Sequence, residues 1–250
     1  MMPLKRFRLS AVCLLLLGGY TSAQAAIAPD RTRLVFRGED KSISVDLKNA
    51  NTSLPYLAQS WIEDANGNKI TSPLTVVPPV QRIEAAGTGQ VKVQGMPALA
   101  SLAKDRETLF YFNVREIPPQ SDKANTLQIA LQTRIKVFYR PQALSKTDTQ
   151  HPWQYKVTLT RQGESYQVVN PTGYFVVLSN ASAQVDGLPA KGFTPLVLAP
   201  NSSAEMKVKA GDLGHAPVLT YVNDFGARLP MIFNCSGNTC TVDEQKSRKS

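Results

Sequence analysis

The sequence is poor in the side chains on which most enzymatic chemistry depends. It has 3 cysteines and 2 histidines among 250 residues. A Ser-His-Asp triad would have to use His151, in a polar connection, or His215, in a loop flanked by Gly and Pro. The sequence also lacks a Gly-x-Ser-x-Gly elbow, a phosphate-binding loop and a His-Glu-x-x-His motif. We therefore expect no catalytic residues, no metal, no cofactor and no nucleotide.

Paired carboxylates are an alternative that the residues leave open. Glu107, Glu116 and Asp224 each neighbour basic residues or turns. For such acids a structural ion pair is the default interpretation, and we expect a protein that is not an enzyme.

Dense basic runs are scarce as well. The formal net charge is +9, and beyond the first 25 residues the only dense basic run is the tail Lys246, Arg248 and Lys249. Binding to nucleic acid requires a clustered basic face with interleaved aromatic residues. The sequence shows no such face, so we expect no nucleic-acid partner.

Long apolar runs are absent except near the N-terminus. Lys5, Arg6 and Arg8 precede the short apolar run 11–17, and Ala23-Gln24-Ala25 fits a small-x-small cleavage site. This pattern predicts a secretory signal peptide over residues 1–25, cleaved after Ala25. The run is too short to span a bilayer, although an N-terminal membrane anchor is the alternative. We expect an exported protein.

Two cysteines remain after this cleavage, Cys235 and Cys240. They flank the turn-like spacer Ser-Gly-Asn-Thr. In an exported protein this spacing predicts a disulfide that closes a hairpin. The alternative is half of a zinc site, which would need two further ligands.

Helical periodicity is nearly absent, and short alternating runs recur between Gly, Pro, Asn and Asp residues. This pattern predicts an all-β fold of two immunoglobulin-like β-sandwich domains. We place the first domain at residues 26–141, a linker at 142–152 and the second domain at 153–250. The first domain has about seven expected strands: 33–37, 42–48, 56–63, 75–78, 90–94, 108–115 and 127–140. Strands resume at 153–161, 166–169, 174–178, 195–198, 204–209, 218–222, 231–235 and 240–242.

The last expected strand of the first domain, Leu127–Arg140, is unusually long. Its alternating apolar positions begin with Leu127, Ile129 and Leu131, and the far end of the segment carries basic residues. At roughly 3.3 Å per residue it would reach about 46 Å. A strand of this length can serve its own sheet with one half and offer the other half to a partner, because an open apolar edge is a docking site.

Several segments resemble the periplasmic pilus (fimbrial) chaperone family, from about Ala26 to Val242. They are Asp30–Arg33 (DRTR), Leu54–Gln59 (LPYLAQ), Pro78–Arg82 (PPVQR), Arg106–Pro119 (RETLFYFNVREIPP), Leu127–Pro141 and Tyr221–Gly226 (YVNDFG). The resemblance implies two immunoglobulin-like domains set in an L with a cleft between them. It also implies a periplasmic protein that binds pilus subunits one to one, folds and caps them, and delivers them to an outer-membrane usher.

The resemblance also implies roles for individual residues. Leu127, Ile129 and Leu131 would fill the groove of a subunit that lacks its final strand. Arg33 and Lys136 would grip the C-terminal carboxylate of the subunit, with Thr32 as a further contact. Lys136 has the opposite parity to the three apolar residues, so a twist or a bulge near Thr133 is expected.

A charged trio would bridge the two domains and fix the angle of the cleft: Glu107, Arg140 and Asp224. Two other functions are weighed against the chaperone. One is a structural or carbohydrate-binding adhesin component of the same surface system, and the other is an exported enzyme built on paired sandwiches. A self-dimer of the unloaded protein is a further alternative partner, because it would hide the apolar strand.

Overall fold

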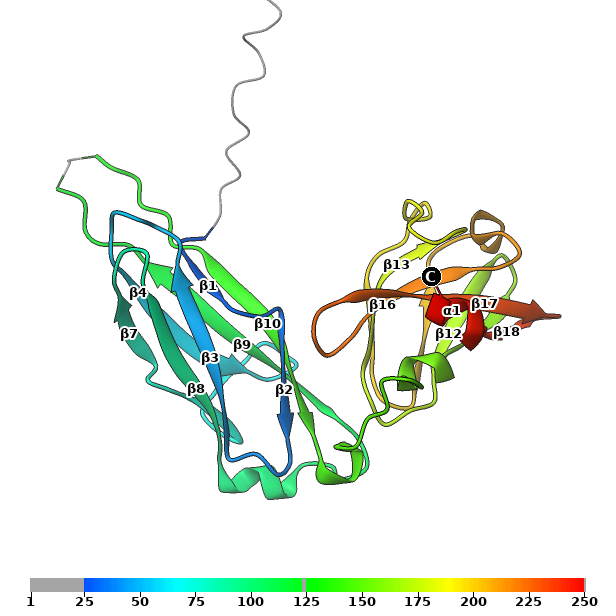
Figure 1. The fold of residues 1–250 in the computed structure, drawn as a ribbon, viewed down its shortest axis with the longest axis horizontal. Helices are drawn as coiled ribbons and strands as arrows, with labels where there is room; N and C mark the ends of the chain where they lie inside the picture. Colours follow the sequence, from blue (N-terminus) through cyan, green and yellow to red (C-terminus); the bar gives the residue numbers. More distant parts are fainter. Residues whose placement is uncertain (1–24, 123–124, 250) are drawn as a thin grey trace, which may run out of the picture.

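Alternating apolar and polar residues fold most of the described chain into β-sheets. The computed structural model describes residues 25–122 and 125–249. They form two β-sandwich domains that lie side by side and meet near the end of β10 (Figure 1). The described chain contains one α-helix, α1 (Glu244–Lys249).

Two sheets make up the first domain. Its strands are β1 (Ile27–Pro29), β2 (Arg33–Arg37), β3 (Ser42–Asn49), β4 (Tyr56–Glu63), β5 (Lys69–Ile70), β6 (Leu74–Val77), β7 (Val80–Ile83), β8 (Thr88–Gly95), β9 (Thr108–Ile117) and β10 (Gln132–Arg140). One sheet has the order β1-β3-β8-β6, and the other has the order β2-β10-β9-β4-β5, with β7 paired to β4. All pairs are antiparallel except β2 with β10, which is parallel.

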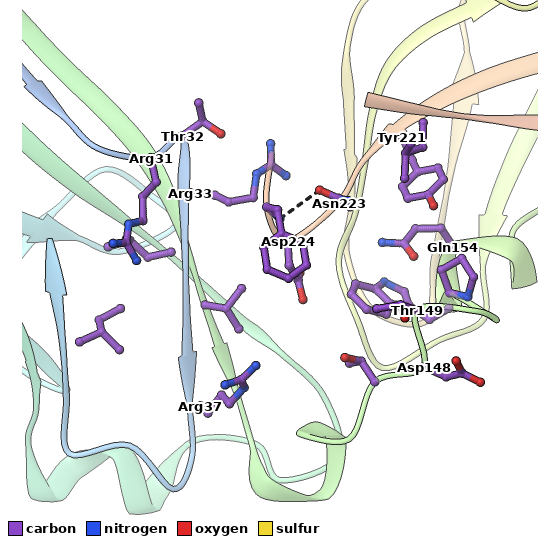
Figure 2. Close-up of a pocket in the computed structure, with 18 of the residues that line it drawn as sticks. Arg31, Thr32, Arg33, Arg37, Asp148, Thr149, Gln154, Tyr221, Asn223 and Asp224 are labelled. Carbon is purple, nitrogen blue, oxygen red and sulfur yellow. Dashed lines mark hydrogen bonds between the residues drawn. The ribbon is translucent and has the colours of Figure 1, made fainter. Parts of the chain in front are cut away.

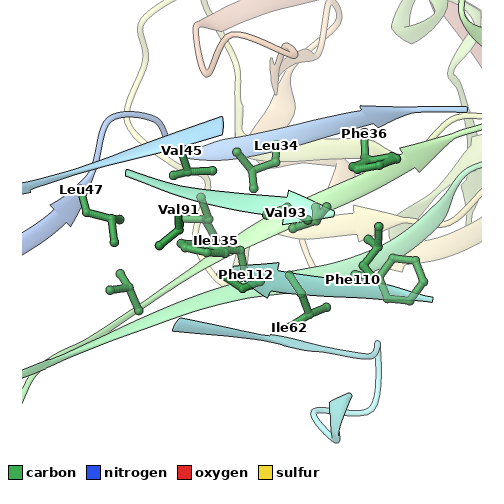
Figure 3. Packing of buried hydrophobic residues seen from close by; sticks show 14 of the residues in the cluster. Leu34, Phe36, Val45, Leu47, Ile62, Val91, Val93, Phe110, Phe112 and Ile135 are labelled. Atoms are coloured by element: carbon green, nitrogen blue, oxygen red, sulfur yellow. The ribbon is translucent and has the colours of Figure 1, made fainter. Parts of the chain in front are cut away.

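The core of this domain lies between the inner faces of the two sheets (Figure 3). Val45, Leu47, Val91 and Val93 face inward from β3 and β8 and are fully buried. The opposite sheet contributes larger side chains to the same layer: Leu34, Phe36, Ile62, Phe110, Phe112 and Ile135. Because successive strand residues point to opposite faces, the other half of each strand faces outward.

The second domain is a less regular sandwich of eight strands. They are β11 (Thr158–Gln162), β12 (Ser165–Asn170), β13 (Val176–Ser182), β14 (Leu196–Leu198), β15 (Ser202–Met206), β16 (Val218–Val222), β17 (Arg228–Ser236) and β18 (Thr239–Val242). Their order is β14-β13-β16-β17-β18-β11-β12-β15. The start of β17 pairs with β16 and its end pairs with β18, so this strand passes from one sheet to the other.

Cys235 and Cys240 form the disulfide that the sequence predicts. They pair directly in the β17–β18 hairpin, with a Cα–Cα distance of 3.9 Å.

Several of the expected strands differ in extent from the observed ones, and two of them start at least five residues too early. Residues Trp153–Lys156 form a 3-10 helix rather than the start of a strand. The ring of Trp153 stacks on Tyr174 with centroids 4.4 Å apart, so this segment packs at the domain junction instead of joining a sheet. The second error is the long strand: β10 begins at Gln132, and residues 127–131 are not in a sheet. The partner strand β9 ends at Ile117, before Pro118-Pro119, because proline lacks the N–H that would continue the ladder.

Candidate functional site: the interdomain cleft and the edge of β10

The two faces of β10 lie in different environments. Ile135, Val137 and Tyr139 are buried in the core of the first domain. Residues of the other parity lie on the outer face of the sheet, where Phe138 faces the second domain and its ring lies 5.7 Å from that of Phe175. The register with β9 runs without a shift from Gln132 to Tyr139. The bulge expected near Thr133 is therefore absent from this ladder, and Lys136 lies on the outer face of an ordinary strand.

Arg140, the last residue of β10, connects the two domains. Its Nε donates to Glu107 Oε1 at 2.7 Å, within the first domain. Its two terminal nitrogens donate to Asp224 in the second domain, at 2.7 and 2.9 Å. The side chains of Arg140 and Glu107 are each 1% exposed, against 23% for Asp224. The structure thus brings together the three charged residues that the family resemblance pointed to.

Backbone contacts add to this junction. The N–H of Glu107 donates to the carbonyl of Gly173 at 2.8 Å, and Phe175 N–H donates to Glu107 Oε2 at 2.7 Å. Glu107 therefore contacts the second domain through its main chain and its side chain. The guanidinium of Arg140 also lies 4.9 Å from the ring centre of Trp153.

The environment affects the two buried partners differently. Burial alone would lower the pKa of Arg140, but its hydrogen bonds to Asp224 and the charge of Glu107 outweigh this effect and raise the pKa. Burial raises the pKa of Glu107, and the charge of Arg140 opposes that rise. Arg140 thus remains a cation, and its two carboxylates compensate for the cost of burying it.

A cleft of about 540 Å³ lies between the domains, next to this junction. Thr32 and Arg33 line it from the first domain, and Gln154, Tyr221 and Asn223 line it from the second (Figure 2). The turn between β16 and β17 projects toward the first domain (Figure 1). Gly226 in this turn has φ +88°, and a Cβ there would lie 2.6 Å from Thr32 Oγ1. A glycine is required at this close approach.

Arg33 and Lys136 are neighbours in the parallel pair of β2 and β10. One terminal nitrogen of Arg33 donates to the carbonyl of Val222 across the cleft at 3.3 Å. Its Nε is buried and has no hydrogen-bond partner among the described residues. Neither cation forms an ion pair with an acidic residue in the ranges that the structure describes.

Both of these cations are destabilised by their surroundings. Burial lowers the pKa of Lys136, and the charges of Arg33 and Arg134 lower it further. Burial also lowers the pKa of Arg33, although the charge of Asp224 opposes this effect. Two adjacent, partly buried cations that form no direct ion pair make a site that an anion would stabilise.

Beyond Lys136, one edge of β10 is open. Strand β2 pairs with β10 only from Lys136 to Arg140, so Gln132–Ile135 pair with β9 alone. Residues 127–131 come directly before β10, and we name them the docking segment. Leu127 is 85% exposed, Ile129 64% and Leu131 37%. The carbonyl of Leu131 accepts the N–H of Glu116 at 3.0 Å.

Arg134 packs on the outer face of the unpaired part of β10, residues 132–135. The sequence alone does not indicate this role. Its guanidinium lies 3.3 Å from the ring centre of Tyr111, and its Nε donates to Glu63 at 2.8 Å. Gln132 Nε2 donates to Asn113 Oδ1 at 2.9 Å. The sequence feature that could have indicated it is strand parity: Gln132 and Arg134 alternate in step with Lys136 and therefore lie on the same face of β10.

The fold and the cleft define a protein of two immunoglobulin-like domains with an open strand edge and a cationic site between them. Comparison with known families identifies the class. Residues 26–145 match the family described as pili and flagellar-assembly chaperone, PapD N-terminal domain. Residues 152–233 match the pili assembly chaperone PapD, C-terminal domain.

Relatives match over nearly the whole chain. The probable fimbrial chaperone YfcS of Escherichia coli K12 is 62% identical over 97% of this chain and 96% of its own. The chaperone protein PapD of Escherichia coli is 43% identical over 97% of this chain and 99% of its own. The crystal structure of the YadV chaperone has a TM-score of 0.65 and 33% identity, and it covers 82% of this chain and 97% of its own.

The chain therefore belongs to the PapD family of pili assembly chaperones. The family resemblance inferred from the sequence and the all-β fold of two sandwiches are both confirmed. The protein is a fimbrial chaperone, and its family places it in the periplasm. The alternative of an adhesin component is not supported by these relatives.

We predict that Glu107→Ala lowers the free energy of unfolding by about 3 kcal/mol, because it leaves Arg140 buried with one carboxylate fewer. Asp224→Ala should cost less, since Asp224 is partly solvated. Denaturant unfolding measures both losses, and small-angle scattering reports the angle between the domains. Glu84→Ala removes an exposed partner of Arg82 and serves as the control. Unchanged stability and an unchanged angle in Glu107→Ala would contradict the bridging role.

Proposed function

We propose that this chaperone binds one pilus subunit at a time by adding its docking segment and the open edge of β10 to the subunit's incomplete sheet. Arg33 and Lys136, with Thr32 beside them, bind the subunit's C-terminal carboxylate. Strand addition of this kind uses main-chain hydrogen bonds for affinity and side-chain pockets for specificity, and chaperone–pilin pairs are a standard example of it. The single observation that carries the proposal is the register of β2 on β10.

Strand β2 begins at Arg33, opposite Lys136, and runs parallel to β10. A partner strand on the open edge before Lys136 would occupy the place that β2 occupies after it. If that strand also runs parallel to β10, its C-terminus meets the beginning of β2. The terminal carboxylate then lies beside Arg33 and Lys136, the two cations that form no ion pair in the described structure.

The apolar residues of the docking segment supply the second part of the binding energy. Leu127 and Ile129 are largely exposed, and Leu131 is partly so. Burial of three such side chains in a subunit contributes roughly 5–9 kcal/mol before the cost of ordering the segment. Family relatives are named fimbrial chaperones, which supports a pilus subunit as the occupant.

Three further points belong to this proposal. The protein reaches the periplasm by cleavage of residues 1–25, which lie almost entirely outside the described residues. It delivers its subunit to an outer-membrane usher, and it does so without catalysis, metal or nucleotide. The domain limits at residues 141 and 153 are also retained as predictions.

We predict that Arg33→Ala and Lys136→Ala each abolish a stable complex with a co-expressed candidate pilin while the chaperone stays folded. Each change removes one of two adjacent charge-assisted contacts to the carboxylate. Size-exclusion chromatography of periplasmic extracts measures the one-to-one complex. Lys92→Ala, an exposed cation on β8, is the matched control. Equal recovery of pilin with the wild type and all three variants would refute the carboxylate anchor.

A substitution in the docking segment tests the apolar contribution separately. Ile129→Ala should weaken subunit binding about 10- to 100-fold, as expected for one buried aliphatic side chain. The free chaperone should unfold at the same denaturant concentration as the wild type, because Ile129 is 64% exposed there. Leu188→Ala, at an exposed position of the second domain, is the control for affinity. An unaltered dissociation constant for Ile129→Ala would place the subunit elsewhere.

Subunit affinity should also fall as the pH rises through the lowered pKa of Lys136. The pKa of Lys136 is lowered from 10.5 in the free chaperone, and a bound carboxylate favours its charged form. Binding therefore takes up a proton once the pH exceeds the lowered pKa, and affinity is lost as the pH rises through it. Lys136→Arg stays charged, so its binding should vary less with pH in titration calorimetry. The same pH slope for both proteins would exclude Lys136 as the titrating group.

A further inference from the structure

Glu116 is a buried acid that forms no ion pair with the described residues. It lies near the end of β9 on the core face and is 5% exposed. Its Oε2 accepts the backbone N–H of Ile27 at 2.9 Å. None of the ion pairs formed by the described residues includes Glu116. One neutral N–H is weak compensation for a carboxylate that has been removed from water, so a positive partner is expected.

The chain itself carries the group that can supply this partner. Ala26 precedes Ile27, and its carbonyl accepts Ala50 N–H at 2.7 Å while Ile27 pairs with Asn49. These contacts fix the main chain on both sides of the Ala26–Ile27 peptide bond. The nitrogen of Ala26 is joined to the nitrogen of Ile27 by the bonds N–Cα, Cα–C and C–N. It therefore lies close to the carboxylate that Ile27 N–H contacts.

Cleavage of the signal peptide changes the chemistry of that nitrogen. A signal peptidase hydrolyses the peptide bond between Ala25 and Ala26 with one water molecule. The hydroxyl of the water goes to the Ala25 carbonyl carbon, and its proton goes to the Ala26 nitrogen. The resulting amine takes up a further proton at neutral pH and becomes an ammonium group with three donors. A neutral amide is thereby replaced by a cation beside Glu116.

We propose that the Glu116 carboxylate is the binding site for the α-ammonium group of the mature N-terminus. The ion pair forms only after cleavage, and it ties β1 to β9. In the uncleaved chain the same nitrogen is an amide with a single N–H and no charge. The cationic partner of the buried carboxylate therefore exists only in the mature protein.

Glu116 also contacts the docking segment. Its backbone N–H donates to the carbonyl of Leu131 at 3.0 Å. The side chain of one residue therefore holds the mature N-terminus, while its main chain holds the last residue of the docking segment. Glu116 is in this sense a positioning residue for subunit binding, a statement that rests on the function proposed above. The ion pair itself requires only the proposed cleavage after Ala25 and not the binding of a subunit.

The test compares three forms of the mature chain, residues 26–250. They are the free amine, the Nα-acetylated chain and the chain with reductively dimethylated amines, in which the nitrogen remains cationic. Acetylation should raise the equilibrium constant for unfolding at neutral pH about 10- to 100-fold, the range for a charge-assisted hydrogen bond. Dimethylation should have a much smaller effect. Equal effects of the two modifications would overturn the proposal.

Glu116→Gln provides the second arm of a double-mutant cycle. Glutamine retains an oxygen that can accept Ile27 N–H but removes the charge. Acetylation should therefore have little further effect in this variant, whereas additive losses would refute the ion pair. If Glu116→Gln does not fold, the comparison of the acetylated with the dimethylated wild-type chain still tests the ion pair.

Amide hydrogen exchange tests the positioning role without a subunit. Acetylation should accelerate exchange at Glu116 N–H, the donor to Leu131, and leave Leu219 in the second domain unchanged. A measurable ion pair together with unaltered exchange at Glu116 would refute the positioning role alone. Neither result would change the outcome expected for Arg33→Ala with pilin, so the proposed function is judged separately.

Discussion

The buried guanidinium of Arg140 is the interaction on which the cleft depends. A buried arginine requires acidic partners, and here one partner comes from each domain, Glu107 and Asp224. Asp224 lies in the turn that brings Gly226 against Thr32. The same ion-pair network therefore sets the distance between the two walls of the cleft. Without it, Phe138 and Phe175 would still pack, but an apolar contact has no direction that could fix the turn.

One strand then connects the cleft to the docking edge. At the end of β10, Arg140 is hydrogen-bonded to Asp224 of the second domain. In the middle of β10, at Lys136, pairing with β2 begins. Its first residues have no neighbour on that side in the described structure. The aromatic and ionic contacts of Arg134 keep these residues in the geometry of a strand, so a partner meets an edge that is already ordered. Order before binding lowers the entropic cost of association.

Alternation and turn residues were sufficient to predict the two sandwiches, because both depend on local periodicity and on the burial of one strand face. The same periodicity could not show where β10 begins: Leu127 and Ile129 alternate like strand residues, but a strand also needs a partner, and β9 ends at Ile117. The parity of Lys136 follows from the sequence and needs no bulge, but alternation alone does not show that the outer face of β10 packs toward the second domain, as Phe138 does against Phe175. Glu116 was expected to form an ordinary ion pair, since the sequence gives no distance between β9 and the N-terminus.

Recognition by a strand edge has an inherent weakness, because main-chain hydrogen bonds do not distinguish one register from another. A slip by one residue would turn every apolar side chain of the partner to the wrong face. In the proposed complex, a cationic site at a fixed position on the edge would remove this ambiguity, since a chain has only one terminal carboxylate. Lys136 and Arg33 lie at the point where β2 begins and would block further extension of a parallel strand, so charge and steric exclusion would select the same register. The apolar residues of the docking segment can then contribute affinity without having to define the alignment.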